Sequence, residues 1–293
     1  MNGCTPIFIL MKNYFLLLTL LCLSLSARAH DAEVDGIFYN LDTANRTATV
    51  TYKGDNYNSY SNEYSGDVVI PETVTYNGIT YSVTSLGDDC FSGCSSLTSI
   101  TIPNSVTSLG DGCLSDCSSL TAITIPNSVT SLGSSCFEDC SSLTSITIPN
   151  SVTSLGDFCF HSCSSLTSIT IPNSVTSLRS YCLNGCSSLT SIYMLRSTPP
   201  STGYGVFTGT SLETVYVVDE DAKKAYQAKN PWSAYVIVVI PTGIEEMETD
   251  KTAPTIVGCY DLNGKLINGK QRGTVIVRYS DGTTRKVSRR KKR

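Results

Sequence analysis

A repeat of 23 residues constrains this chain more than any other feature. Five near-identical segments follow one another, and the first runs from Val83 to Ser105. Their leading cysteines recur at this interval with no insertion or deletion. A fixed period of this size is typical of a solenoid, in which each repeat forms one coil stacked on the last. We therefore expect an α/β repeat solenoid, with a parallel β-ladder and short helical turns, over residues 83–198.

Apolar and hydroxyl residues alternate within each repeat as they do in a β-strand. In the first repeat, Ile100 and Ile102 are expected to point into the core, with hydroxyl residues between them. The proline that follows ends the strand because it lacks the backbone donor that a ladder needs. Stacked coils would therefore carry a flat grid of hydroxyl groups, our candidate interaction face. It comprises Ser99, Thr101, Thr124, Ser145, Thr147, Ser168, Thr170, Ser191 and Tyr193.

Each repeat also contains a Cys-x-x-x-Cys pair. Residues 111–117 are expected to form a single helical turn with Cys113 and Cys117 on one face. Buried thiols are the favoured interpretation, because free cysteine is among the most buried residue types. Disulfides are permitted in an exported protein, but side chains four residues apart on a helical turn approach poorly for a bridge. A zinc site is a third alternative, although five equal pairs would leave one pair over.

A β-rich cap is predicted before the repeats, over residues 30–82. Residues 36–41 and 47–52 have the composition of two hairpin strands. Asn77-Gly78 lies between two further β-rich runs, which favours a type I′ turn. Such a cap would cover the apolar side chains and the unpaired strand edge at an open solenoid end.

A second cap, with a strand-helix-strand order, is predicted for residues 199–241. Strands are expected at residues 215–218 and 236–240. Asp219 is the expected N-cap of a helix over residues 222–228. Trp232, the single tryptophan, would seal the core together with Tyr226.

Both termini carry segments outside the expected solenoid. Residues 1–29 have the apolar stretch and the Ala-Arg-Ala cleavage pattern of a signal peptide. A linker at residues 242–254 precedes a small β-domain at residues 255–293. From residue 243 onward there are 12 Lys or Arg against 6 Asp or Glu, whereas the rest has 9 against 19, so two separate units are expected. An exported chain rarely meets nucleic acid, so we interpret the basic end as a solvated tail.

The sequence offers little for catalysis. It has two histidines, His30 and His161, and no phosphate-binding loop, metal-spaced histidine pair or nucleophile elbow. Acidic residues gather in the variable part of the repeats, where calcium binding is conceivable. They do not recur at one fixed place, as calcium-binding repeats require, so a solvated acidic edge is the favoured interpretation. We expect no enzyme activity, no metal and no cofactor.

The repeat core Ser-Leu-Thr-Ser-Ile-Thr-Ile-Pro-Asn-Ser-Val-Thr-Ser-Leu-Gly closely resembles the BspA-like leucine-rich repeats of bacterial surface proteins. The resemblance covers about Val83 to Ile192 and implies a leucine-rich-repeat-like fold on an extracellular or surface protein, some members being adhesins. Many family repeats have alanine at the place of Cys90, which supports a buried role for that residue. The segment from Gly273 to Val287 is similar to the C-terminal β-domains of proteins exported by the type IX pathway.

These observations favour a secreted or surface-attached, adhesin-like binding module on the outside of a bacterial cell. One face of the array would recognise a host or bacterial surface protein or glycan. No nucleic-acid partner is expected, and the membrane is met only in transit or by surface attachment. The alternative is a structural spacer or surface-layer component without a specific ligand. The hydroxyl grid could also meet a regular lattice, such as a polysaccharide or ice, or be the wetted face of a sheet.

Overall fold

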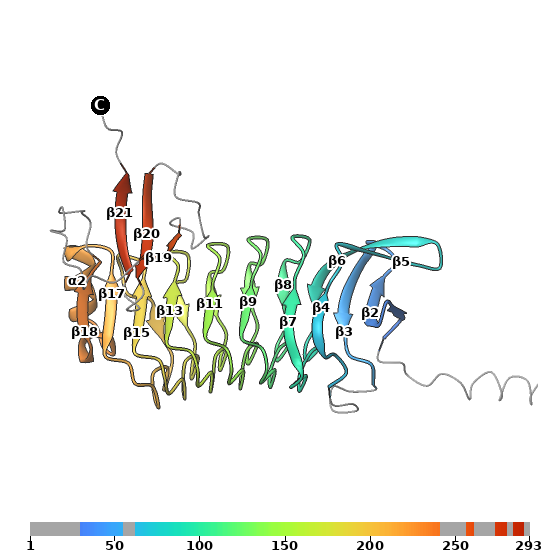
Figure 1. Ribbon diagram of the computed structural model, residues 1–293, viewed down its shortest axis with the longest axis horizontal. Coiled ribbons are helices and arrows are strands. Elements are labelled where there is room, and N and C mark those ends of the chain that lie inside the picture. Colours follow the sequence, from blue (N-terminus) through green and yellow to red (C-terminus); the bar gives the residue numbers. More distant parts are fainter. Residues whose placement is uncertain (1–29, 55–61, 241–255, 261–272, 280–283, 290–293) are drawn as a thin grey trace, which may run out of the picture.

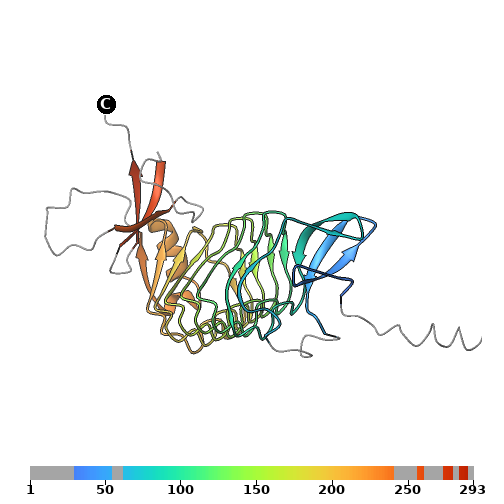
Figure 2. The ribbon, with the colours of Figure 1, turned by 45° about the vertical axis from the view of Figure 1, so that its right-hand side comes forward.

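The computed structural model describes residues 30–54, 62–240, 256–260, 273–279 and 284–289. The repeats stack into a parallel solenoid, which confirms the predicted fold class. A β-rich region lies at the N-terminal end of the array, and helix α2 (Glu220–Gln227) lies at the other end (Figure 1). The coils superimpose along the length of the array in a second view (Figure 2).

Each coil contributes strands to two parallel ladders, whereas the sequence predicted one. The predicted ladder, here called the long-strand ladder, holds the inward isoleucines and the outward hydroxyl residues. Its register repeats from coil to coil, with Ile123 paired to Ile146. Its strands are β9 (Ala122–Thr124), β11 (Ser145–Thr147), β13 (Ser168–Ile171), β15 (Ser191–Met194), β17 (Thr214–Val217) and β18 (Val236–Val239).

The second ladder, here called the short-strand ladder, is built mainly from Ser-Leu dipeptides. Leu109 pairs with Leu132 in the next coil, and both side chains are buried. Strands of two residues are too short to show an alternating pattern, so they could not be recognised in the sequence. The ladder consists of β6 (Ile79–Leu86), β8 (Ser108–Leu109), β10 (Ser131–Leu132), β12 (Ser154–Leu155), β14 (Ser177–Leu178) and β16 (Ser201–Thr202).

Residues 111–116 form consecutive turns in place of the predicted single helical turn; together with the same positions of the other coils they are here called the turn edge. Gly112 and Asp116 have φ angles of 60° and 59°, a left-handed conformation that interrupts a right-handed helix. Alternate backbone N–H groups of the turn reach the neighbouring coil, as the 3.0 Å bond from Leu114 N to Cys136 O shows, whereas Ser115 N bonds within the turn to Gly112 O at 3.0 Å. The coils are therefore joined along the turns as well as along both ladders.

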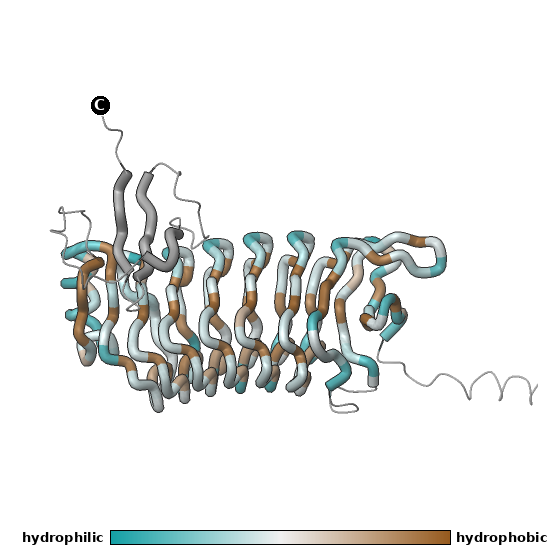
Figure 3. Tube along the Cα trace, in the orientation of Figure 1, coloured by the Kyte–Doolittle hydropathy of each residue, from teal (hydrophilic) through white to brown (hydrophobic). Residues whose placement is uncertain are grey.

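Apolar residues recur at the same places in every coil (Figure 3), and their side chains are buried between the ladders and the turn edge. In the second coil, Leu114, Cys117 and Leu120 are fully buried. The rings of Phe137 and Phe160, one coil apart, stack at 5.3 Å between centroids. The interior is thus one continuous core, closed between neighbouring coils, as expected for a solenoid.

At the N-terminal end, β1 (Ala32–Val34), β2 (Ile37–Asp42) and β3 (Thr47–Thr51) form antiparallel pairs, and β3 continues the short-strand ladder through β6. The predicted hairpin is β2–β3. A second hairpin joins β5 (Thr73–Tyr76) to β6 through Asn77 and Gly78, whose φ angles of 50° and 77° suit the predicted type I′ turn.

At the C-terminal end, residues 201–217 form a further coil, because β16 and β17 extend both ladders. Helix α2 follows, and Asp219 caps it as predicted by accepting a 2.7 Å hydrogen bond from Ala222 N. Trp232 begins a short 3-10 helix, η1 (Trp232–Ala234), and packs edge-on against Tyr226 with both rings buried. Strand β18 then lengthens the long-strand ladder.

Three further strands, β19 (Ile256–Tyr260), β20 (Gly273–Tyr279) and β21 (Thr284–Arg289), form an antiparallel sheet within the expected C-terminal β-domain. The predicted signal peptide, the linker at residues 242–254 and the two predicted turns of this domain lie outside the described residues. Over the part of the chain that the structure describes, no helix has the length and apolar character needed to cross a membrane.

Candidate interaction face

The structure brings the predicted hydroxyl residues together on the outer face of the long-strand ladder and of the adjacent strand β7 (Leu97–Thr101). Corresponding residues lie side by side, with Thr124 paired to Thr147 and Ser168 paired to Ser191. Ser99, Thr101, Thr124, Ser145 and Thr147 are exposed, whereas Ser168, Thr170 and Ser191 are partly buried. The grid is therefore most accessible over the first three coils.

Tyr193 differs from the rest of the predicted face. It pairs in register with Thr170, but its side chain is only 6% exposed. Its ring stacks on Tyr216 of the next strand, at 4.7 Å between centroids and 10° between planes. Tyr193 therefore packs against its neighbour instead of offering a free hydroxyl, and the ladder continues through Thr214 to an exposed valine, Val236.

A strand that the sequence assigned only to the cap also belongs to this face. Strand β4 (Gly66–Val69) pairs in parallel with β7 (Leu97–Thr101). The Asp67 carboxylate accepts hydrogen bonds from the hydroxyls of Ser99 at 2.7 Å and Thr98 at 2.9 Å, and these bonds lower the pKa of Asp67. The sequence analysis assigned this segment to the β-rich cap and did not indicate its partner strand.

The face opens into a groove between β7 and β9. Strand β7 pairs with β4, and among the described strands it forms no ladder with β9. The groove has a volume of about 380 Å³, and Thr101 and Thr124 both line it. Ala122 stands where the next repeats have serine, so a smaller side chain borders the opening.

The cysteines of the repeats are buried free thiols, in agreement with the favoured interpretation. The second thiol of a pair donates to a carbonyl of the preceding coil, from Cys117 to Phe91 O at 3.2 Å and from Cys186 to Phe160 O at 3.0 Å. Burial raises the pKa of the Cys140 thiol to about 12. These groups therefore act as packing and hydrogen-bonding residues of the core.

Three carboxylates of the acidic edge share one repeat position, but Ser134 and Ser180 stand there in the other two coils, so the position is not acidic throughout. Asp88, Asp111 and Asp157 occupy the same repeat position. Their Oδ1 atoms accept from the backbone N–H of Asp111, Ser134 and Ser180 in the next coil, at 2.7–2.8 Å. The aspartates thus join coils to one another. Among the described residues, no three His, Cys, Asp or Glu side chains are arranged to hold a metal ion.

Comparison with known families agrees with this architecture. The model of the BspA type leucine-rich repeat region matches six copies, over residues 72–190 and 110–227. The chain belongs to this family. The match extends beyond the five repeats on both sides, in keeping with the further coil at residues 201–217. A search of curated proteins gave no match.

Solved structures of leucine-rich repeat proteins resemble the chain in part. A leucine-rich cell surface protein of Faecalibacterium prausnitzii A2-165 is 28% identical with a TM-score of 0.48; the match covers 64% of this chain and 55% of that protein. The leucine-rich repeat protein of T. pallidum is 24% identical with a TM-score of 0.48, covering 61% and 88%. One from Bacteroides ovatus is 20% identical with a TM-score of 0.36, covering 72% and 77%. The chain thus spans about half of the F. prausnitzii protein.

Proposed function

We propose that this protein is a non-enzymatic, adhesin-like binding module that is exported and presented on the outer surface of a bacterial cell. The observation that carries the proposal is the exposed hydroxyl grid, which widens into a groove between β7 and β9. Parallel pairing on both sides of each coil holds this grid in a fixed register. A preformed surface favours binding because little conformational entropy is lost on association.

A binding assay with matched charge variants tests this use of the face. The full chain is incubated with immobilised matrix proteins and mucin glycans, beside the double variant Thr124→Lys/Thr147→Lys. Two cations on the grid are expected to weaken binding at least about tenfold, a change of about 1.4 kcal/mol. Ser131→Lys adds a cation at an exposed position of the short-strand ladder and should leave binding unchanged.

The outcomes separate the competing functions. Unchanged binding by the double variant would reject the long-strand face as the site. Failure of the unmodified chain to bind any protein or glycan would favour a structural spacer or surface-layer component instead.

Export and attachment are tested separately on cells. We propose that residues 1–29 direct export and that residues 255–293 direct sorting by the type IX route. Immunolabelling of intact cells should detect the full chain at the surface and lose that signal when residues 255–293 are deleted. Equal surface labelling of both forms would contradict a sorting role for the C-terminal segment.

A further inference from the structure

Aromatic side chains gather on the turn edge at the C-terminal end of the array. Phe158 and Tyr181 occupy the same position in successive coils, and their rings stack at 4.9 Å between centroids. Tyr204, in the following coil, meets Tyr181 edge-on at 5.4 Å. Three successive coils therefore place their rings in one continuous row.

The backbone at the first two rings does not favour large side chains. Phe158 and Tyr181 have φ angles of 58° and 57°. This left-handed region is costly for bulky residues, and the same turn position in the earlier coils carries Asp89, Gly112 and Ser135. The turn thus has no need of a ring at this position. Strained residues of this kind cluster at ligand sites, so the surface beside the aromatic row is a candidate ligand site.

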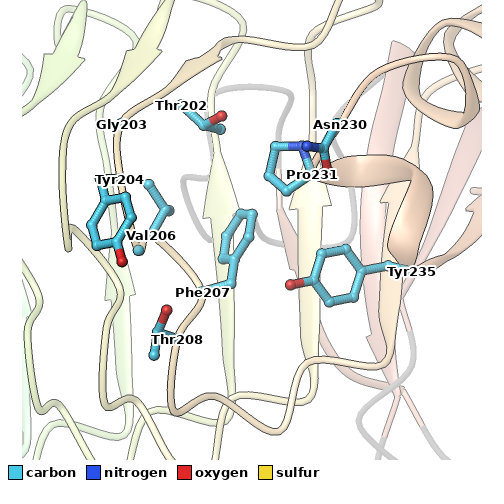
Figure 4. A pocket seen from close by; sticks show the side chains of 10 residues that line it. Thr202, Gly203, Tyr204, Val206, Phe207, Thr208, Asn230, Pro231 and Tyr235 are labelled. Carbon is cyan, nitrogen blue, oxygen red and sulfur yellow. The ribbon is translucent and has the colours of Figure 1, made fainter.

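A pocket of about 550 Å³ opens next to the row, between the turn after β16 and residues 230–235. In Figure 4, Tyr204 stands on one side of Phe207, and Pro231 and Tyr235 stand on the other. Phe207 is 8% exposed and is held edge-on by Trp232 at 5.1 Å and by Tyr235 at 5.5 Å. Tyr204 is 75% exposed. The ring of Phe207 therefore forms an apolar floor, and Tyr204 and Tyr235 lie on either side of it.

The polar groups around this pocket are all uncharged. The lining contains no Asp, Glu, Lys, Arg or His, and its side-chain donors and acceptors are hydroxyls and one amide. A phosphate, carboxylate or ammonium ligand would find no opposite charge there, and leaving its own charge unpaired is costly. The polar side chains are those of Thr202, Tyr204, Thr208, Asn230 and Tyr235.

Aromatic faces combined with neutral hydroxyl and amide groups match the chemistry of a sugar ring. The C–H face of a pyranose packs on an aromatic ring, while its hydroxyls exchange hydrogen bonds with neutral polar groups. We propose that the pocket between Tyr204 and Tyr235 binds one sugar residue of an uncharged glycan. The site uses Thr202, at the end of β16, and residues between β16 and β18, and none of the predicted grid residues lines it.

Titration of the full chain with uncharged oligosaccharides tests the proposal. The panel contains oligomers of glucose, mannose, galactose, xylose and N-acetylglucosamine, and binding is followed by calorimetry and by the fluorescence of Trp232, which contacts Phe207. At least one of these sugars is expected to bind saturably. Tyr204→Ala should weaken that binding about tenfold, and Tyr204→Phe should retain most of it because the ring remains.

Two controls keep the result interpretable. Because Tyr204 is largely exposed, Tyr204→Ala should unfold at the same denaturant concentration as the unmodified chain. Ser131→Lys alters the short-strand ladder, outside both proposed sites, and should leave oligosaccharide binding unchanged. The proposal is overturned if no uncharged oligosaccharide binds, if only charged ones bind, or if Tyr204→Ala binds as tightly as the unmodified chain. Sugar binding that Thr124→Lys/Thr147→Lys abolishes and Tyr204→Ala leaves intact would also overturn it and would place the glycan on the interaction face.

Discussion

Two cysteines at the same repeat position should differ in their contribution to stability, because their acceptors differ. Cys140 Sγ donates to Leu114 O at 3.2 Å, and this is the one donor that the carbonyl meets among the described residues. Cys163 Sγ donates to Phe137 O at 3.1 Å, but that carbonyl also accepts from Cys140 N at 3.3 Å. Only the loss of the Cys140 thiol leaves a buried acceptor with no donor.

The magnitudes follow from these contacts. Replacing either cysteine by alanine removes a fully buried sulfur atom, which costs about 1–2 kcal/mol in lost apolar burial and cavity formation. In Cys140→Ala the unpaired carbonyl of Leu114 adds about 1–3 kcal/mol. We therefore expect Cys140→Ala to destabilise the array by at least about 1 kcal/mol more than Cys163→Ala.

Urea unfolding under reducing conditions measures this difference. Far-UV circular dichroism follows the coils, and Trp232 fluorescence follows the C-terminal end. Cys140→Ser keeps an O–H donor for the Leu114 carbonyl and should recover part of the lost stability. Equal free energies of unfolding for Cys140→Ala and Cys163→Ala would refute the reasoning, because the unpaired carbonyl of Leu114 would then cost no stability.

Three further results are expected. Gly133→Ala should destabilise the array by about 1–3 kcal/mol, because the new Cβ would lie 2.5 Å from the backbone of the preceding coil. The control Ser134→Ala should change the urea midpoint little. Equal urea midpoints for the two variants would contradict this close approach. Alkylation at pH 8 should label the cysteines of the array only after unfolding, because burial raises the pKa of thiols such as Cys140. Mass spectrometry that finds labelled array cysteines in the native chain would contradict it. Asp67→Asn should lower stability near neutral pH and lose this effect in acid. The lowered pKa of Asp67 means that its carboxylate stabilises the fold above the unfolded pKa of about 3.9, and that this stabilisation disappears as the pH falls through the folded pKa. A difference in thermal midpoint between the unmodified chain and Asp67→Asn that does not change with pH would argue against the bonds from Ser99 and Thr98.

The periodic part of the fold could be predicted from sequence because the same residue pattern recurs in five repeats. The alternation around Ile100 located the predicted ladder, and Asn77-Gly78 located a turn, since each depends on local geometry. The short-strand ladder escaped notice because a pair such as Ser108-Leu109 forms a strand only when another coil lies beside it. The helical turn failed for a related reason: alternate N–H groups, such as those of Gly112 and Leu114, bond to the next coil, and the left-handed residues interrupt the helix.

The candidate site was predicted less completely than the fold. Outward positions such as Thr124 and Thr147 follow from alternation, and the structure places them on an exposed face. The burial of Tyr193 depends on Tyr216, which lies 23 residues later in a segment interpreted as a cap. The pairing of β4 with β7 likewise joins segments about 30 residues apart, and no local pattern encodes such a partner.

The constant spacing of paired residues has a consequence for the history of the molecule. Since Leu109 meets Leu132 as Leu132 meets Leu155, excision of residues 106–128 would join two coils through contacts of a kind already present. Duplication of the same stretch would do likewise. Recombination between the repeated stretches of the gene can therefore lengthen or shorten the rod in whole steps, while both ends keep their own sequence.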